Sequence, residues 1–195
     1  MDYPQYAMVD GIKYEINTDF RVAIRCQQVA EDTTIDDYER PLAIIYLLFG
    51  EKGLNSDHKT ELLNQGLKYL TCGKELEKSD EEPDMDYTED YDYIVASFMS
   101  DFNIDLDETK MHWWKFNKLM NGLSNSEMGN CCVLNRIRSI RNCNLADIQD
   151  KKERDKIREA KERVALKKYK KENKLTKEQE ESMNRLDKML GLEKR

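Results

Sequence analysis

The sequence predicts a mainly α-helical protein with a small N-terminal β-hairpin and an extended, charged C-terminal helical appendage. Apolar residues recur at helical spacing along most of the chain, whereas strand-like segments around a turn signal occur near the N-terminus. The 195 residues are 39% hydrophobic and 36% charged, which suits one modest core. We therefore divide the chain into a helical core domain, residues 1–146, and a basic helical appendage, residues 147–195.

Charge is distributed unevenly between these two parts. Residues 1–146 carry 27 acidic and 15 basic side chains, whereas residues 147–195 carry 12 and 17, and the net charge is -7. A basic tail on an acidic body can bind nucleic acid, an acidic partner or its own body. With no bilayer-length apolar run and no signal peptide, we expect a soluble protein that is not exported. Five cysteines without paired CxxC spacing predict reduced thiols.

The first 34 residues contain a hairpin signal followed by a helix signal. Residues 6–9 and 12–16 flank Asp10-Gly11, a pair that tolerates the positive φ angles of a two-residue turn. Thr18 or Asp19 then caps a helix that ends near residues 32–34.

Two further helices follow. Pro41 fits the first turn of a helix, and the apolar residues 42–49 continue it until Gly50 terminates it. Ser56 or Asp57 begins the next helix, which ends at Gly73. One face of that helix is expected to carry its apolar residues, Leu62, Leu63, Leu67 and Leu70.

Residues 75–92 form an acidic segment with ten acidic residues, one lysine and Pro83. Charge repulsion and low apolar content predict a solvated loop between two helical halves rather than packed structure. Acidic bait for a basic partner is the alternative. A cation site is disfavoured because the glycine-turned spacing of a calcium loop is absent.

The densest stretch lies between residues 98 and 141 and is centred on the segment 111–116, which contains both tryptophans. A helix from Met111 to Leu123 places four residues on one apolar stripe, and we assign them to the core: Trp113, Phe116, Met120 and Leu123. Trp114 lies about 100° away from that stripe. It either widens the core or remains partly exposed as a binding anchor.

A helix over residues 91–102 precedes the tryptophan segment, and a helix over residues 128–141 follows it. Val133, Ile137 and Ile140 are expected to supply the core stripe of the second helix. Arg138 and Arg141 share one side of it and could bind an anion, but pairing with the surplus carboxylates is favoured.

The appendage contains two capping boxes. Asp150 and Glu153 open a long helix running towards Lys171 that is too polar to be core, and Thr176 and Gln179 open the last helix. The narrow apolar stripe of the last helix suits docking to the body, a second copy or a partner, and consists of Met183, Leu186 and Leu190.

The sequence predicts no catalytic, cofactor or metal site. His58 and His112 lack metal-ligand spacing, and no glycine-rich phosphate loop follows a strand. We favour a packing or hydrogen-bonded surface role for His112 over a role as a base. Nucleic-acid binding is disfavoured because acids interleave with the basic residues of the tail, where Tyr169 is the lone aromatic residue.

Three stretches together resemble a family of small tail-module proteins of long-tailed bacteriophages of Gram-positive bacteria, usually assigned as tail-assembly chaperones. These are Asp10 to Arg21, residues 98–123 with the block His-Trp-Trp-Lys-Phe at 112–116, and residues 137–154. The resemblance covers roughly residues 6–170, and the last helix lies outside it.

The resemblance implies a non-catalytic protein of the host cytoplasm that binds the tape-measure protein, recruits tail-tube subunits of the major tail protein, and is absent from the finished virion. Two alternatives stay open: a structural tail or head-tail connector subunit, and a nucleic-acid-binding accessory protein. Self-association also stays open. From the residue pattern, we expect partner contacts first at Met183, Leu186 and Leu190, and second at Trp114 and Lys118.

Overall fold

A computed structural model describes residues 2–75, 83–125 and 131–167. It confirms the mainly helical fold with an N-terminal two-stranded antiparallel hairpin. The described strands and helices are, in chain order, β1 (Tyr6–Val9), β2 (Ile12–Glu15), α1 (Phe20–Glu31), α2 (Glu39–Leu54), α3 (Lys59–Leu70), α4 (Tyr91–Phe102), α5 (Trp113–Asn121), α6 (Val133–Asn142), a short 3-10 helix (Leu145–Asp147) and α7 (Lys151–Val164).

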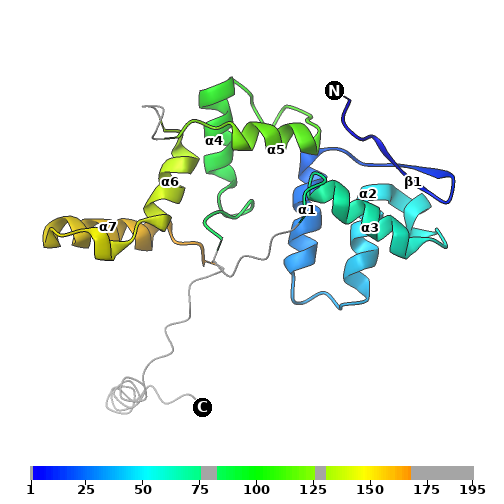
Figure 1. The fold of residues 1–195 in the computed structure, drawn as a ribbon, viewed down its shortest axis with the longest axis horizontal. Coiled ribbons are helices and arrows are strands. Elements are labelled where there is room, and N and C mark those ends of the chain that lie inside the picture. Colours follow the sequence, from blue (N-terminus) through cyan, green and yellow to red (C-terminus); the bar gives the residue numbers. More distant parts are fainter. Residues whose placement is uncertain (1, 76–82, 126–130, 168–195) are drawn as a thin grey trace, which may run out of the picture.

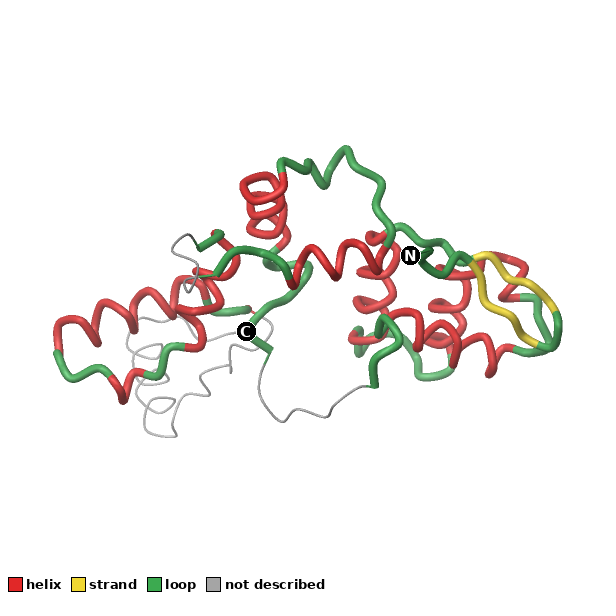
Figure 2. The backbone as a smooth tube through the Cα atoms, turned by 45° about the horizontal axis from the view of Figure 1, so that its top comes forward, coloured by secondary structure: helices red, strands yellow, loops and turns green. Residues whose placement is uncertain are grey.

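The elements form two groups joined by α5. The hairpin lies with α1, α2 and α3 on one side, whereas α4, α6 and α7 lie on the other (Figures 1 and 2). Helix α5 runs between the groups and packs against α1. The segment with both tryptophans therefore occupies the junction of the molecule.

The hairpin forms through its two turn residues, as the sequence predicts. Asp10 and Gly11 have φ angles of 48° and 75°, and the strands pair in the register Val9 with Ile12. Both angles lie in the left-handed region that this turn requires. Tyr14 anchors the hairpin to the body, because its buried hydroxyl hydrogen-bonds to Ser56 Oγ at 2.8 Å.

Local signals also set the limits of α1 and α2. Asp19, rather than Thr18, caps α1, since its carboxylate accepts a hydrogen bond from the Arg21 amide at 2.9 Å. Pro41 lies in the first turn of α2. Gly50, with φ 63° and ψ -159°, interrupts α2 where the sequence predicts its end, and a further helical turn follows.

Helix α3 is rotated relative to the predicted apolar face. Leu62 is buried as expected, but the expectation for Leu67 is wrong, because Leu67 is 42% exposed. Gly66 faces the core instead, and a Cβ atom added there would lie 2.8 Å from Leu48. The close approach of α3 to α2 at this glycine turns Tyr69 inward and Leu67 outward.

A stack of aromatic rings crosses the junction. The Phe116 ring of α5 lies between Phe20 of α1, at 4.6 Å between centroids, and Phe98 of α4, at 5.2 Å. Trp113 stacks on Phe116 at 5.7 Å. Phe116 therefore contributes to the packing of both groups. Of the other residues assigned to the stripe, Leu123 is buried and Met120 is partly buried.

The acidic segment is packed over its described part, which corrects the expectation of a solvated loop. Met85 and Tyr87 pack against the core, and Asp90 is 1% exposed. The Asp90 carboxylate forms an ion pair with Arg141 at 2.6 Å, and Asp84 forms one with Arg138 at 3.1 Å. These long-range pairs offset the charge repulsion that the local sequence suggests.

Helices α6 and α7 form the far end of the described chain. The fully buried residue of α6 is Leu134, whereas the expected stripe of Val133, Ile137 and Ile140 is only partly buried. Asp150 caps α7 as predicted by accepting from the Glu153 amide at 2.8 Å. No residue of α7 is buried. The predicted last helix with Met183, Leu186 and Leu190 lies outside the described residues.

Candidate functional site

Trp114 and Lys118 line one pocket of about 300 Å³. They lie one turn apart on α5, so the helix directs both side chains to the same side. The rest of the wall comes from the end of α3, from α1 and from the acidic segment. We call this site the tryptophan pocket; its lining residues are Gln27, Leu70, Thr71, Cys72, Lys74, Tyr87, Trp113, Trp114, Asn117, Lys118 and Asn121.

The two indole rings hold the pocket together. Trp113 Nε1 donates a hydrogen bond to the carbonyl oxygen of Leu70, and Trp114 Nε1 donates to that of Tyr69, both at 2.9 Å. Carbonyls in the last turn of a helix lack partners within the helix. The tryptophans therefore cap the end of α3 and fix it against α5, while the Trp114 ring stays partly exposed.

A left-handed turn brings the backbone after α3 against Trp114. Cys72 and Gly73 have φ angles of 54° and 76°, and the Gly73 amide donates to the Lys68 carbonyl at 2.8 Å. A Cβ atom at Gly73 would lie 3.7 Å from the Trp114 ring. This turn directs the chain to Lys74, which places a second lysine at the pocket.

The pocket is electropositive within an acidic body. Lys74 and Lys118 are exposed lining residues, and the lining contains no carboxylate. The Lys118 ammonium also lies 4.8 Å from the centre of the Tyr3 ring. The amide nitrogen of Asn117, another lining residue, is buried without a hydrogen-bond partner within the described chain. The pocket thus combines aromatic surface with cationic and hydrogen-bond-donating groups.

The titratable groups of the pocket favour binding over nucleophilic chemistry. Burial raises the pKa of the Cys72 thiol, although Lys74 and Lys118 act in the opposite direction. A thiol with a raised pKa remains protonated near neutral pH and is a weak nucleophile. Burial also raises the pKa of Tyr87 to about 12.

His112 has a structural position at the start of α5. Its Nδ1 accepts a hydrogen bond from the Trp114 amide at 3.0 Å, which caps the helix. Its Nε2 lies 3.0 Å from the carbonyl oxygen of Pro4, and its ring stacks on Tyr3. These contacts agree with the hydrogen-bonded role expected for His112.

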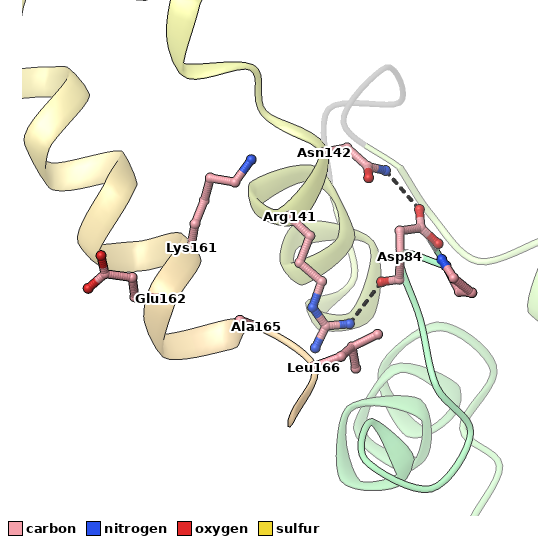
Figure 3. Close-up of a pocket in the computed structure, with 8 residues that line it drawn as sticks. Asp84, Arg141, Asn142, Lys161, Glu162, Ala165 and Leu166 are labelled. Carbon is pink, nitrogen blue, oxygen red and sulfur yellow. Dashed lines mark hydrogen bonds between the residues drawn. The ribbon is translucent and has the colours of Figure 1, made fainter. Parts of the chain in front are cut away.

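A second pocket, of about 320 Å³, lies between α6, the end of α7 and the middle of the acidic segment at Pro83 and Asp84 (Figure 3). Arg141 points into it, but the guanidinium already donates to the carbonyls of Val164 and Asp84 and to the Asp90 carboxylate. Pairing with carboxylates, which the sequence favours over anion binding, is confirmed for Arg138 and Arg141.

The Arg141 contacts also fix the chain where the described part ends. Leu166 is buried, and the Lys167 amide donates to the Glu89 carboxylate at 2.7 Å. Residues 164–167 are therefore held against the acidic segment, and this second pocket is part of that junction.

Neither a metal site nor a membrane-spanning helix is found within residues 2–75, 83–125 and 131–167. No three His, Cys, Asp or Glu side chains are grouped so that they could bind a metal ion. None of the helices there combines the length and apolar content that crossing a bilayer requires.

The sequence predicts only the α5 side of the tryptophan pocket. Trp114 and Lys118 are one helical turn apart, so their spacing in the sequence predicts that they lie close together. Gln27, Lys74 and Tyr87 come from three other segments. Only the Gly73 signal for a helix end hints that Lys74 follows a sharp turn.

Comparison with known proteins identifies a family but no individual relative. No curated protein and no solved structure matches the chain. A family model described as Bacteriophage Gp15 protein matches residues 4–166, a range that includes every helix and strand described above. The chain therefore belongs to the bacteriophage Gp15 protein family.

Proposed function

We propose that this phage protein is a non-catalytic tail-assembly chaperone that binds the tape-measure protein and helps to recruit subunits of the major tail protein. The observation that carries the proposal is membership of a bacteriophage protein family over residues 4–166. The block at residues 112–116, which resembles that of tail-assembly chaperones, forms the junction of the fold.

The surface chemistry supports a binding role. A chaperone that coats a long client needs contacts that are repeated along the client and individually weak. The tryptophan pocket offers such a contact, since it has a partly exposed aromatic ring, two lysines and a small volume. We place one client contact there and a second on the helix predicted from the sequence at Met183, Leu186 and Leu190.

The proposed location follows from the role. A chaperone acts in the host cytoplasm before the tail is complete and leaves before the virion is finished. A structural tail or connector subunit would instead remain in the particle. Mass spectrometry of purified virions distinguishes the two, because only the connector would be present in stoichiometric amounts.

The direct test is co-expression of the chain with the tape-measure protein of the same phage. We expect the full chain to keep the tape-measure protein in the supernatant and to co-purify with it. A variant lacking residues 172–195 should co-purify less if Met183, Leu186 and Leu190 form a contact. An unchanged solubility of the tape-measure protein with the full chain present would rule out direct chaperoning.

A salt titration tests the remaining alternative to a chaperone, which is a nucleic-acid-binding protein. Binding of duplex DNA or RNA that weakens steeply with salt would favour a nucleic-acid-binding accessory role. If the chain is a chaperone, we expect its complex with the tape-measure protein to form in the presence of excess competing DNA.

A further inference from the structure

The tryptophan pocket contains an apolar surface open to a ligand. Trp114 is partly exposed, and it lies beside the side chains of Leu70 and Trp113 at the junction of α3 and α5. Aromatic rings that keep an exposed face provide large contact area at low entropic cost. The surface suits an apolar side chain inserted from another polypeptide.

The rim of the pocket, formed by Lys74 and Lys118, should favour ligands of opposite charge. Lys74 and Lys118 have no ion pair with any described carboxylate, although residues 1–146 contain 27 acidic and 15 basic side chains. Arg138 and Arg141, in contrast, are paired with acids. Two lysines without an ion pair around an apolar surface favour a ligand that carries carboxylates next to its apolar group.

Asn117 provides a third, independent feature. It lines the same pocket, and its Nδ2 is buried without an acceptor among the residues of the described chain. Leaving a buried donor unpaired costs about 1–3 kcal/mol. Because this nitrogen has almost no accessible surface, the Asn117 side chain would have to rotate towards a carbonyl or carboxylate oxygen of a bound peptide to pair with it.

We propose that the tryptophan pocket binds a polypeptide segment in which an apolar side chain is flanked by acidic residues. The identity of the client as the tape-measure protein rests on the proposed function, but the chemistry of the segment rests on this pocket alone. A nucleic acid fits less well, since two lysines neutralise few phosphates.

Intrinsic fluorescence gives a direct readout, because the chain contains two tryptophans and both line the pocket. A peptide array with a central leucine or phenylalanine, flanked by glutamate or by lysine in otherwise identical peptides, is first probed with the full chain. The tightest peptide of each charge is then titrated while tryptophan emission is recorded.

The decisive variant carries Lys74→Glu and Lys118→Glu. We expect the natural chain to prefer glutamate-flanked peptides by about tenfold and the variant to prefer lysine-flanked ones, because the rim charge is reversed. Lys68→Glu with Lys115→Glu is the matched control, since these exposed lysines lie on α3 and α5, close in sequence to Lys74 and Lys118, but outside the pocket lining. The control should keep the preference of the natural chain.

The inference is overturned if reversal of the rim charges leaves the preference unchanged, if peptides bind without altering tryptophan emission, or if an oligonucleotide binds the pocket more tightly than any peptide. Co-purification with the tape-measure protein is scored separately. If the tape-measure protein fails to co-purify while glutamate-flanked peptides bind, the chaperone role fails and the pocket assignment stands. If it co-purifies with the natural chain and array binding shows no charge preference, the chaperone role stands and the pocket assignment fails.

Discussion

Trp113 and Trp114 donate their indole hydrogens to adjacent carbonyl oxygens, those of Leu70 and Tyr69, each over 2.9 Å. Neighbouring residues on a helix point about 100° apart. Both rings nevertheless reach the end of α3, because α3 ends directly against the start of α5. The pair thus has a structural role in addition to lining the pocket.

The two indole bonds should differ in their contribution to stability. Trp113→Phe is expected to lower the free energy of unfolding by about 1–3 kcal/mol, because it leaves the partly buried carbonyl of Leu70 without the indole donor. Trp114→Phe should cost less, since Tyr69 O also accepts from the Cys72 amide at 3.0 Å and Trp114 is partly exposed. Urea unfolding followed by circular dichroism measures both. Equal losses would contradict this explanation.

Removing one partner of the buried ion pair between Arg141 and Asp90 should destabilise the C-terminal half strongly. Arg141→Met leaves a carboxylate that is 1% exposed without its cationic partner, and we expect a loss of about 3–5 kcal/mol. The same change should increase amide hydrogen exchange at Leu166 and Lys167, because the Val164 carbonyl also loses its donor.

Arg138→Met is the matched control for Arg141→Met. Its side chain is 40% exposed in the ion pair with Asp84, so the loss should stay near or below about 1 kcal/mol. If the two substitutions destabilised the protein equally, burial would not be the reason for the strength of the Arg141 pair.

Stability should decline on acidification partly through Asp84. Burial alone would raise the pKa of Asp84, but hydrogen bonds from Arg138 and Asn142 outweigh it and hold the pKa below its ordinary value of 3.8. The unfolded chain then binds a proton at higher pH than the folded chain does. The contribution is therefore present above the ordinary value and is lost as the pH falls through the lower, folded value.

Urea unfolding at a series of pH values checks this dependence. Asp84→Asn should flatten the acid side of the stability curve, and Arg138→Met should flatten it as well by removing the cation beside the carboxylate. A curve for Asp84→Asn that parallels the natural chain down to the lowest pH would show that other carboxylates account for the acid sensitivity.

Gly50 should tolerate substitution poorly. Its φ of 63° and ψ of -159° lie in a region that is accessible essentially to glycine, so Gly50→Ala is expected to cost about 1–3 kcal/mol. Gly122→Ala is the control, because Gly122 has a φ of -95°, which any residue can adopt. Thermal unfolding of the two variants tests the difference, and similar melting temperatures would argue against backbone strain at Gly50.

Local chemistry made most of the fold predictable. The turn at Asp10 and Gly11, the caps at Asp19 and Asp150, and the break at Gly50 each depend on backbone angles or hydrogen bonds within a few residues. Such interactions are formed between neighbours in the chain, so the sequence displays them directly.

The features that the sequence did not reveal depend on partners far along the chain. Asp90 and Arg141 are 51 residues apart, and the composition around Asp90 suggests only repulsion. Likewise, the rotation of α3 depends on how closely Gly66 approaches Leu48. In the tryptophan pocket, the contribution of α5 was predictable from the sequence. Lys74 and Tyr87 are brought to the pocket only by tertiary structure.

The position of Phe116 between Phe20 and Phe98 has a consequence for how the molecule opens. Separation of either group from α5 exposes one face of the same buried ring, and therefore weakens the packing that remains on its other face. The two groups should lose their structure in one cooperative transition rather than in sequence. Amide protons on both sides of α5 would then report the same opening free energy in native-state hydrogen exchange.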